Sequence, residues 1–285
     1  MQRWNRIVML VAFLAAGIAA VNANDARFSR ESFTLGQVTL PYRKAEICHS
    51  DAEKPALVLY LHGGSSRGSD NEAQLKENAV NVIYQYLLDR DITATFIVPQ
   101  CPTGGGWTSQ NRKVVNELLK SFVKAGTVDA DHVYVMGGSM GGTGTWSQLS
   151  YFPNFYAAAM PVAGNPSGMN AANVATTPVL TVMGTADAIM SIPDVETFMA
   201  DVIAAGGSVQ LDTEEGWSHP TTCKQSYTEE RLDWLFSQVR GVETGIREIG
   251  SVSKSSSTIY NLSGRPQSHP ASGIYIKDGK KYIQR

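Results

Sequence analysis

Apolar residues along the chain fall into two alternating kinds of segment. Continuous or nearly continuous apolar runs are typical of strands buried on both faces of a sheet, and they lie at 56–61, 94–98, 133–136 and 179–183, with weaker candidates at 156–162 and 209–211. Apolar residues at helical spacing lie between these runs, at 80–89, 112–124, 194–205 and 227–239. This alternation predicts an α/β fold, in which a mostly parallel sheet has helices on both faces and right-handed crossovers.

The first residues have the pattern of a secretory signal peptide. Arg3 and Arg6 form a basic start, and residues 7–21 carry no charge and are mostly apolar. Residues 21–23 (Val-Asn-Ala) then form a small-residue cleavage site. An uncleaved anchor is the alternative, but the apolar stretch is shorter than the ~20 residues that a spanning helix needs. We therefore expect cleavage after Ala23 and a secreted, periplasmic or cell-surface protein without a stable membrane span.

The segments that flank the alternating body differ from it. Residues 32–47 alternate moderately and predict an antiparallel pair of edge strands. Residues 251–257 are Ser-rich, which is typical of a linker, and the β-type segments after it include a hairpin-turn dipeptide at 278–279 (Asp-Gly). The predicted organisation is a signal peptide, an α/β domain, a linker and a small β-rich tail, over 1–23, 24–249, 250–257 and 258–285.

Charge is unevenly distributed along the 285-residue chain, whose formal net charge is −2. Six basic residues and one acidic residue lie from 250 onward, whereas 24–249 holds sixteen basic and twenty-five acidic residues. An acidic body argues against nucleic acid as a partner. The basic tail is either a solvated surface or a contact for an anionic partner.

The cysteines and histidines do not have the spacing of zinc ligands. We therefore expect neither a metal nor an organic cofactor. Export would permit a disulfide among Cys48, Cys101 and Cys223, and the sequence leaves the pairing open. Cys223 follows His219 by four residues, which fits either a catalytic thiol or a small buried residue.

Ser139 lies at the centre of a G-x-S-x-G motif, residues 137–141. The motif directly follows the apolar run at 133–136 and precedes a helix-compatible stretch at 142–149. This is the strand–turn–helix setting of a nucleophile elbow, whose tight turn has glycines where a side chain would clash. An ordinary Gly-rich turn between strand and helix is the alternative. In an elbow, the Ser139 hydroxyl would stand above the carboxyl end of the sheet.

A serine nucleophile needs a base, and the base needs an orienting acid. On a fold with a nucleophile elbow these residues follow in the order Ser, Asp, His. His219 is the histidine that follows the serine within the body, and Asp187 comes shortly after the run at 179–183. Asp194 and Asp212 are weaker rivals for the acid, because the first fits a helix N-terminus and the second the end of a strand.

Ester and amide hydrolysis also need an oxyanion hole, because the tetrahedral intermediate carries negative charge on the former carbonyl oxygen. One donor is expected to be the backbone N–H of Met140, which follows the nucleophile. The other is expected from the loop after the strand at 56–61, which begins His62-Gly63-Gly64. We choose the Gly64 N–H, with that of Gly63 as its rival.

These segments together resemble the α/β-hydrolase superfamily. The chain is most similar to a secreted esterase group that includes feruloyl and acetyl-xylan esterases, polyhydroxybutyrate-depolymerase-like proteins and "predicted peptidases". The residues that carry the resemblance lie at 62–64, 99–102, 107, 137–142, 144–146, 184–187 and 216–219. The resemblance implies Ser139 as nucleophile, His219 as general base and then acid, and Asp187 as the orienting carboxylate. The sequence departs from the family's pattern at Gly138, where the family more often has a bulkier residue, although a small one is tolerated.

The tail has a resemblance of its own. Residues 259–265, 273–276 and 279–281 are similar to C-terminal tails of secreted proteins from Bacteroidetes-type bacteria. Some of these tails are outer-membrane sorting signals. The resemblance implies either recognition by the secretion machinery or a structural tail.

The connection at 163–177 bears on the substrate. It is short and rich in Gly, Asn, Ala, Thr and Ser, so no large amphipathic lid fits there. We expect an open, shallow site, which disfavours long acyl chains and favours a small acyl or aromatic group on a large polymer. Trp107 and Trp217 could stack on a sugar or a phenolic acid, with ordinary packing as the alternative.

The sequence therefore predicts an exported serine carboxylesterase that acts on feruloyl or acetyl esters of plant-cell-wall polysaccharide. A serine peptidase of the prolyl-oligopeptidase type is the second hypothesis. That family normally has a large propeller domain before the hydrolase domain, whereas only residues 24–55 separate the cleavage site from the first buried run. The third is a non-catalytic glycan-binding protein on a hydrolase fold, against which an intact Ser, Asp and His in order argues.

Overall fold

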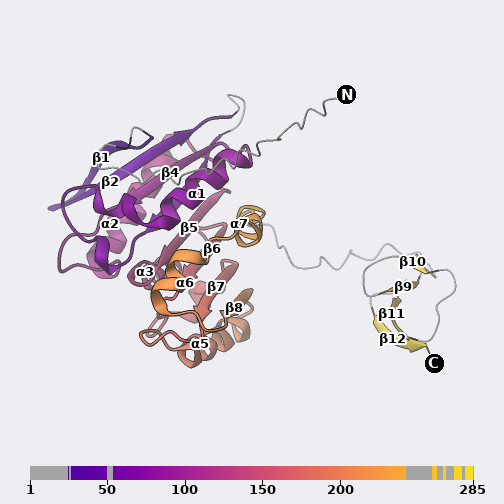
Figure 1. Ribbon diagram of the computed structural model, residues 1–285. Coiled ribbons are helices and arrows are strands. Elements are labelled where there is room, and N and C mark those ends of the chain that lie inside the picture. The colour runs from indigo at the N-terminus through magenta and orange to yellow at the C-terminus, as the bar shows by residue number, and fades with distance from the viewer. Residues whose placement is uncertain are drawn as a thin grey trace, which may run out of the picture. The chain divides into compact units, whose positions relative to one another are not determined.

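The computed structural model describes residue 25, residues 27–49 and 54–241, and the strands of a C-terminal segment. The chain divides into two compact units, residues 1–242 and 243–285 (Figure 1). The predicted signal peptide and linker lie outside the described residues. Within the described part, no helix is long and apolar enough to cross a membrane.

An eight-stranded sheet forms the centre of the first unit, in the order β1-β2-β4-β3-β5-β6-β7-β8. Its strands are β1 (Ser29–Leu35), β2 (Val38–Ile47), β3 (Ala56–Leu61), β4 (Ala94–Pro99), β5 (Val133–Gly138), β6 (Ala158–Val162), β7 (Val179–Gly184) and β8 (Val209–Glu214). β1 and β2 pair antiparallel, as do β2 and β4. All other neighbours are parallel, which confirms the predicted mostly parallel sheet.

Helices cover both faces of this sheet (Figure 1). They are α1 (Asn78–Asp89), α2 (Ser109–Ala125), α3 (Met140–Tyr151), α4 (Ala171–Val174), α5 (Ile192–Ala204), α6 (His219–Gln225) and α7 (Glu229–Phe236), with the 3₁₀ turns η1 (Gly64–Ser66) and η2 (Ala73–Lys76). Buried side chains of α1 and α7 belong to one core cluster. Those of α2 and α3 belong to a second cluster on the other face, together with Phe198 and Val202 of α5.

Strand β3 shows why these residues form a central strand. Val58 and Tyr60 belong to the first core cluster, whereas Leu57, Leu59 and Leu61 belong to the second. Successive side chains of a strand point to opposite faces, and each face here is covered by helices. A strand in this position must be apolar at every residue, as β3 is.

The strand order places a crevice at the carboxyl end of β3. From β3 the chain passes to β4 on one side and then to β5 on the other, so the order reverses between β3 and β5. Leu61 at the end of β3 lies opposite Gly137 in β5. Ligands of open α/β sheets bind at such a switch point.

The structure differs from the sequence prediction in local details. The sequence predicts no helix between 205 and 227, yet His219 is the first residue of the short helix α6, with Pro220 in its first turn. Proline is common in the first turn because its fixed φ suits a helix and because a backbone N–H there would have no intrahelical acceptor, so none is lost. The predicted antiparallel pair is present as β1 and β2 at one edge of the sheet, with β2 next to β4. The connection at 163–177 contains α4, which contacts α3 and α5.

The second unit contains a four-stranded antiparallel sheet in the order β10-β9-β11-β12. Its strands are β9 (Ile259–Asn261), β10 (Pro266–Gln267), β11 (Gly273–Lys277) and β12 (Lys280–Gln284). β11 and β12 pair on either side of the predicted turn at 278–279. The predicted small β appendage is therefore present.

Candidate active site

Ser139 lies between β5 and α3 in a strained backbone conformation, with φ 58° and ψ −118°. Its own N–H donates to the Val162 carbonyl at 3.0 Å, which ties the turn to β6. A positive φ is uncommon for residues other than glycine, and strain of this kind clusters at functional sites. The motif therefore has the geometry of a nucleophile elbow.

Ser139, His219 and Asp187 form a continuous hydrogen-bonded chain. His219 Nε2 lies 2.7 Å from Ser139 Oγ, and His219 Nδ1 lies 2.7 Å from Asp187 Oδ2. The Asp187 side chain is fully buried, and its Oδ1 accepts the N–H groups of Ile189 and Met190. In this arrangement His219 donates from Nδ1 to the carboxylate and accepts the serine proton at Nε2, as a general base must.

The rival acids have other partners. Asp212 accepts a hydrogen bond from Arg231 Nε at 2.8 Å. Asp194 lies in the first turn of α5, where Ser191 caps the helix. The structure therefore brings Asp187, and neither rival, to His219.

Two backbone N–H groups next to Ser139 fit an oxyanion hole. Met140 is the first residue of α3 and Gly64 the first residue of η1, and the first N–H of a helix has no intrahelical acceptor. The rival Gly63 N–H instead donates to Glu77 Oε1 at 2.7 Å. This favours the Gly64 N–H over that of Gly63, and Met140 and Gly64 stay the predicted donors.

His62 fixes the start of the same loop. Its ring is fully buried, Nε2 accepts the Cys101 N–H at 2.9 Å, and Nδ1 donates to the Gly63 carbonyl at 2.6 Å. Because Nε2 accepts, the ring is neutral and carries its proton on Nδ1, and burial lowers the pKa of His62 to about 4. The ring therefore joins β3 to the segment after β4.

We expect this buried histidine to make stability depend on pH. The unfolded chain takes up the proton below a pKa of about 6.5, whereas the folded ring stays neutral until about pH 4. The contribution is thus fully present above pH 6.5 and is lost as pH falls toward 4, by about 3 kcal/mol in the free energy of unfolding. Chemical denaturation at pH 7 and pH 4.5 should show a smaller loss for His62→Gln than for the wild type. Equal losses would contradict this role.

The structure contradicts the stacking role predicted for Trp107. Only 1% of its surface is exposed, and its Nε1–H donates to the His62 carbonyl at 2.9 Å. The ring packs edge-on against His62, and Gly144 makes room for it in α3. Trp107 is a core residue that supports the loop after β3, residues 62–66, which we call the oxyanion loop. Trp217 is half-buried and does not line the pocket described next, so its contact with substrate stays a prediction.

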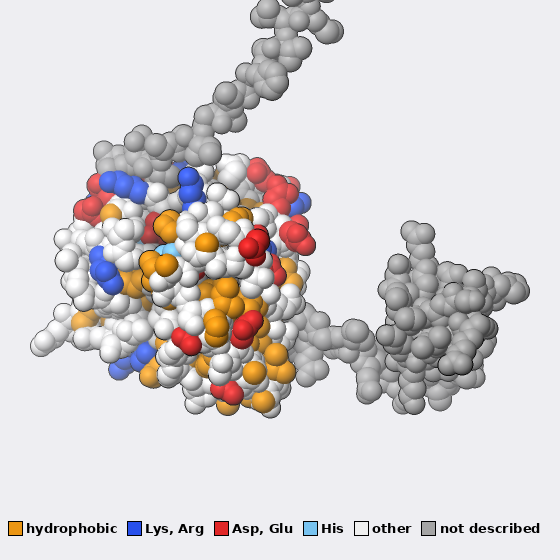
Figure 2. Space-filling view, turned by 60° about the horizontal axis from the view of Figure 1, so that its bottom comes forward, with side chains coloured by type: hydrophobic (Ala, Val, Ile, Leu, Met, Phe, Trp, Pro, Cys, Tyr) orange, Lys and Arg blue, Asp and Glu red, His pale blue; other side chains and the backbone are white. Residues whose placement is uncertain are grey.

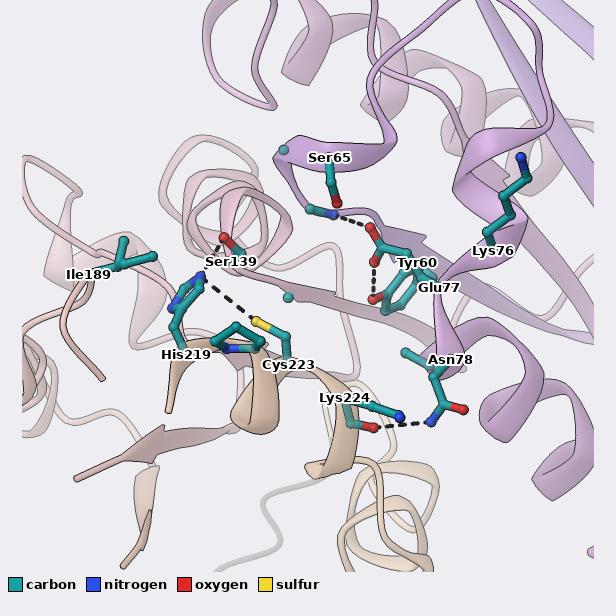
Figure 3. Close-up of a pocket in the computed structure, with 15 residues that line it drawn as sticks. Tyr60, Ser65, Lys76, Glu77, Asn78, Ser139, Ile189, His219, Cys223 and Lys224 are labelled. Carbon is teal, nitrogen blue, oxygen red and sulfur yellow. Dashed lines mark hydrogen bonds between the residues drawn. The ribbon is translucent and has the colours of Figure 1, made fainter. Parts of the chain in front are cut away.

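An open pocket of about 540 Å³ lies over Ser139 and His219. Figure 3 shows Ile189 on the His219 side of this pocket, with Glu77, Lys76 and Asn78 on the opposite side. Ile189 is 67% exposed, so it offers an apolar surface at the rim. On the face seen in Figure 2, hydrophobic side chains gather at the centre and lower part, whereas Lys and Arg lie mainly toward the upper and left margins. No residues from 163–177 line the pocket, in agreement with the absence of a large lid there.

Cys48, Cys101 and Cys223 are all free thiols, so the structure contains no disulfide among them. Cys223 Sγ lines the pocket, 4.0 Å from His219 Nε2 (Figure 3). Burial, together with the nearby acids Glu77 and Asp187, raises the pKa of its thiol to about 12. A thiol this weakly acidic is not a nucleophile at neutral pH, which favours a packing role for Cys223.

Glu77 lines the pocket and is among the residues there that the sequence does not predict. It precedes α1 and lies within hydrogen-bond distance of Tyr60, Gly63 and Ser66. No motif or spacing distinguishes it from other acidic residues at the start of a helix, so the sequence carries no signal for its position. Among the residues described, no cluster of potential metal ligands was found.

Residues 103–233 match the family model described as "Dienelactone hydrolase family", over somewhat less than half of the chain. Among curated protein sequences, none matches significantly. Three solved structures illustrate the structural likeness. A thermostable esterase is 25% identical with a TM-score of 0.69, over 75% of this chain and 64% of that one. A puromycin-hydrolysing peptidase of Mycobacterium tuberculosis is 18% identical with a TM-score of 0.60, over 76% and 40%.

The third is the feruloyl esterase module of Clostridium thermocellum in complex with sinapinate, which is 16% identical with a TM-score of 0.55, over 77% of this chain and 91% of that one. The chain spans less than two thirds of the first two structures. These likenesses, with the sheet order and the elbow, establish that the chain has the α/β-hydrolase fold.

Proposed function

We propose that the protein is a serine carboxylesterase that works through an acyl-enzyme. The observation that carries this proposal is the hydrogen-bonded chain from Ser139 through His219 to Asp187 at the floor of an open pocket. The likeness to a thermostable esterase and to a feruloyl esterase module agrees with it.

The geometry suggests the following reaction. Ser139 Oγ attacks the ester carbonyl while His219 Nε2 takes the hydroxyl proton, and Asp187 stabilises the imidazolium that forms. The N–H groups of Met140 and Gly64 bind the oxyanion. His219 then gives its proton to the leaving alcohol, and water repeats the sequence on the acyl-enzyme. Every group in this scheme is supplied by the chain, and no metal or cofactor takes part.

The pocket favours a small or aromatic acyl group attached to a large alcohol. A volume of about 540 Å³ is in the ordinary range for small-molecule sites, and the absence of pocket-lining residues from 163–177 leaves its mouth free for a polymer. A feruloyl or acetyl ester of plant-cell-wall polysaccharide fits this shape. We also propose that the protein is exported, because residues 1–23 have the signal-peptide pattern, and that the C-terminal tail either serves the secretion machinery or is structural.

A serine peptidase is the second candidate, because the same triad cleaves amides and several solved structures with this fold are peptidases. Steady-state hydrolysis of p-nitrophenyl acetate, methyl ferulate and a proline-type peptide anilide separates the two. We expect both esters to be hydrolysed and the anilide to be a poor substrate, with the ratio of kcat/KM for ferulate and acetate identifying the preferred acyl group. Cleavage of the anilide alone would favour the peptidase. Hydrolysis of none would favour a binding protein.

A further inference from the structure

The carboxyl group of Glu77 holds the oxyanion loop at its first peptide. Oε1 accepts the Gly63 N–H at 2.7 Å and the Ser66 hydroxyl at 2.8 Å. Oε2 accepts the Tyr60 hydroxyl at 2.7 Å (Figure 3). These donors come from both ends of η1 and from β3. One side chain at the start of α1 therefore connects the loop to the sheet and to a helix.

Glu77 is mostly buried, and no Lys, Arg or His in the described part of the chain forms an ion pair with it. Burial raises the pKa of its carboxyl, and the three hydrogen bonds oppose this rise. A buried carboxylate without a cation destabilises the fold unless donors replace its water. Glu77 lies beside the candidate active site, at a position where an apolar side chain would pack without this cost. Its carboxylate oxygens therefore have a role as hydrogen-bond acceptors there.

The geometry of Gly63 shows what that use is. Its backbone is extended, with φ −73° and ψ 175°, so its N–H and that of Gly64 point in different directions. With the Gly63 N–H bound to Glu77, the Gly64 N–H is left for the substrate. A Cβ built on Gly63 would lie 3.7 Å from Ser139 Cβ, so the loop lies directly against the elbow.

We propose that Glu77 is a positioning residue of the esterase site, which fixes the Gly63–Gly64 peptide so that the Gly64 N–H faces the oxyanion. This inference rests on the proposed function. On this inference, the essential feature of Glu77 is an acceptor oxygen on a side chain long enough to reach the Gly63 N–H. The negative charge itself is dispensable, because an amide can accept from Gly63 and Ser66 through its oxygen and donate to Tyr60 through its nitrogen.

The test compares two substitutions with opposite expected outcomes. Glu77→Gln keeps the reach and loses the charge, and we expect it to retain kcat within about 5-fold. Glu77→Asp keeps the charge and remains a good residue at a helix N-terminus, but its carboxylate is too short to reach Gly63. Since one oxyanion donor is worth about 10²–10³ in kcat, we expect Glu77→Asp to lower kcat by about 10²-fold with little change in KM.

A second readout does not depend on finding the right ester. A fluorophosphonate labels Ser139 through a reaction that depends on the same oxyanion donors. We therefore expect the labelling rate to fall in Glu77→Asp and to be retained in Glu77→Gln. Glu46→Asp is the matched control, because Glu46 bonds Thr95 on the sheet and does not line the pocket. Melting temperatures of all variants check that each is folded.

The outcomes separate this inference from the proposed function. If the wild type is labelled at Ser139 but hydrolyses no ester, the proposed esterase function is overturned. The labelling rates of the variants would still test the role of Glu77. Equal activity of Glu77→Asp and wild type, or equal losses in Asp and Gln variants, would overturn the positioning role. A loss of activity in Glu77→Gln alone would show that the negative charge of Glu77 matters and the length of its side chain does not, which would also overturn the proposal.

Discussion

Ser139→Ala is expected to lower kcat/KM for p-nitrophenyl acetate by about 10⁴-fold or more. The variant loses the atom that attacks the carbonyl, and His219 Nε2, now 2.7 Å from where Oγ was, has no hydroxyl to activate. Water could be activated in its place, but only with much lower efficiency. Steady-state kinetics of the wild type and the variant, measured side by side, give this ratio.

The fold should not change in this variant. Alanine keeps the Cβ and the strained φ of 58°, and the hydrogen bond between His219 and Asp187 remains. Ser237→Ala is a matched control, because Ser237 is exposed at the end of α7, and its hydroxyl bonds the Trp234 carbonyl and the Gln238 side chain, far along the chain from the triad. Activity of Ser139→Ala equal to that of Ser237→Ala would assign the nucleophile to another residue, and Cys223 would be the first to examine.

The sequence was sufficient to predict the triad because a parallel sheet brings the ends of its strands together. Ser139 follows β5, Asp187 follows β7 and His219 follows β8. Each strand ends at the same edge, so residues far apart in the chain meet there whenever the strands are identified. The order Ser, Asp, His then left few alternatives, and the structure brings those three side chains into contact.

Side chains whose position depends on packing were not predictable in this way. Trp107 lies in a Gly-rich segment that reads equally well as a substrate loop or as a core residue, and only the small Gly144 of α3 allows its ring to enter the core. Glu77 has no periodicity or motif around it, and its role follows from where α1 begins relative to η1. Both residues support the loop after β3, and both needed the folded structure to be assigned.

The short helix α6 was missed for a different reason. Its seven residues from His219 contain no apolar period, and a helix shorter than about 12–15 residues has little stability of its own. Packing against the end of β7 makes it possible, since Gly184 at that end approaches the Trp217 carbonyl and Thr222. As a result, His219 is held at the start of a helix, with its neighbour Ser218 as the N-cap.

Gly141→Ala is expected to lower the free energy of unfolding by more than about 3 kcal/mol, which overpacking of a close backbone contact can reach. A Cβ at this position would lie 1.8 Å from the Leu61 carbonyl oxygen and 3.0 Å from that of His62. Both atoms belong to the backbone at the end of β3, so no side chain can rotate to relieve the overlap. Chemical denaturation of the variant and the wild type measures the difference.

The same substitution should also affect activity wherever the variant is still folded. The overlap can be relieved only if α3 moves away from β3, and this movement separates Met140 from Gly64. A displacement of about 1 Å in such a site can lower the rate by about 10²-fold. Gly106→Ala is the matched control, because the nearest atom to its new Cβ would be Thr108 Oγ1 at 3.8 Å. A Gly141→Ala variant as stable and active as Gly106→Ala would mean that α3 and β3 are not in contact at this point, and the oxyanion hole described above would then have no fixed width.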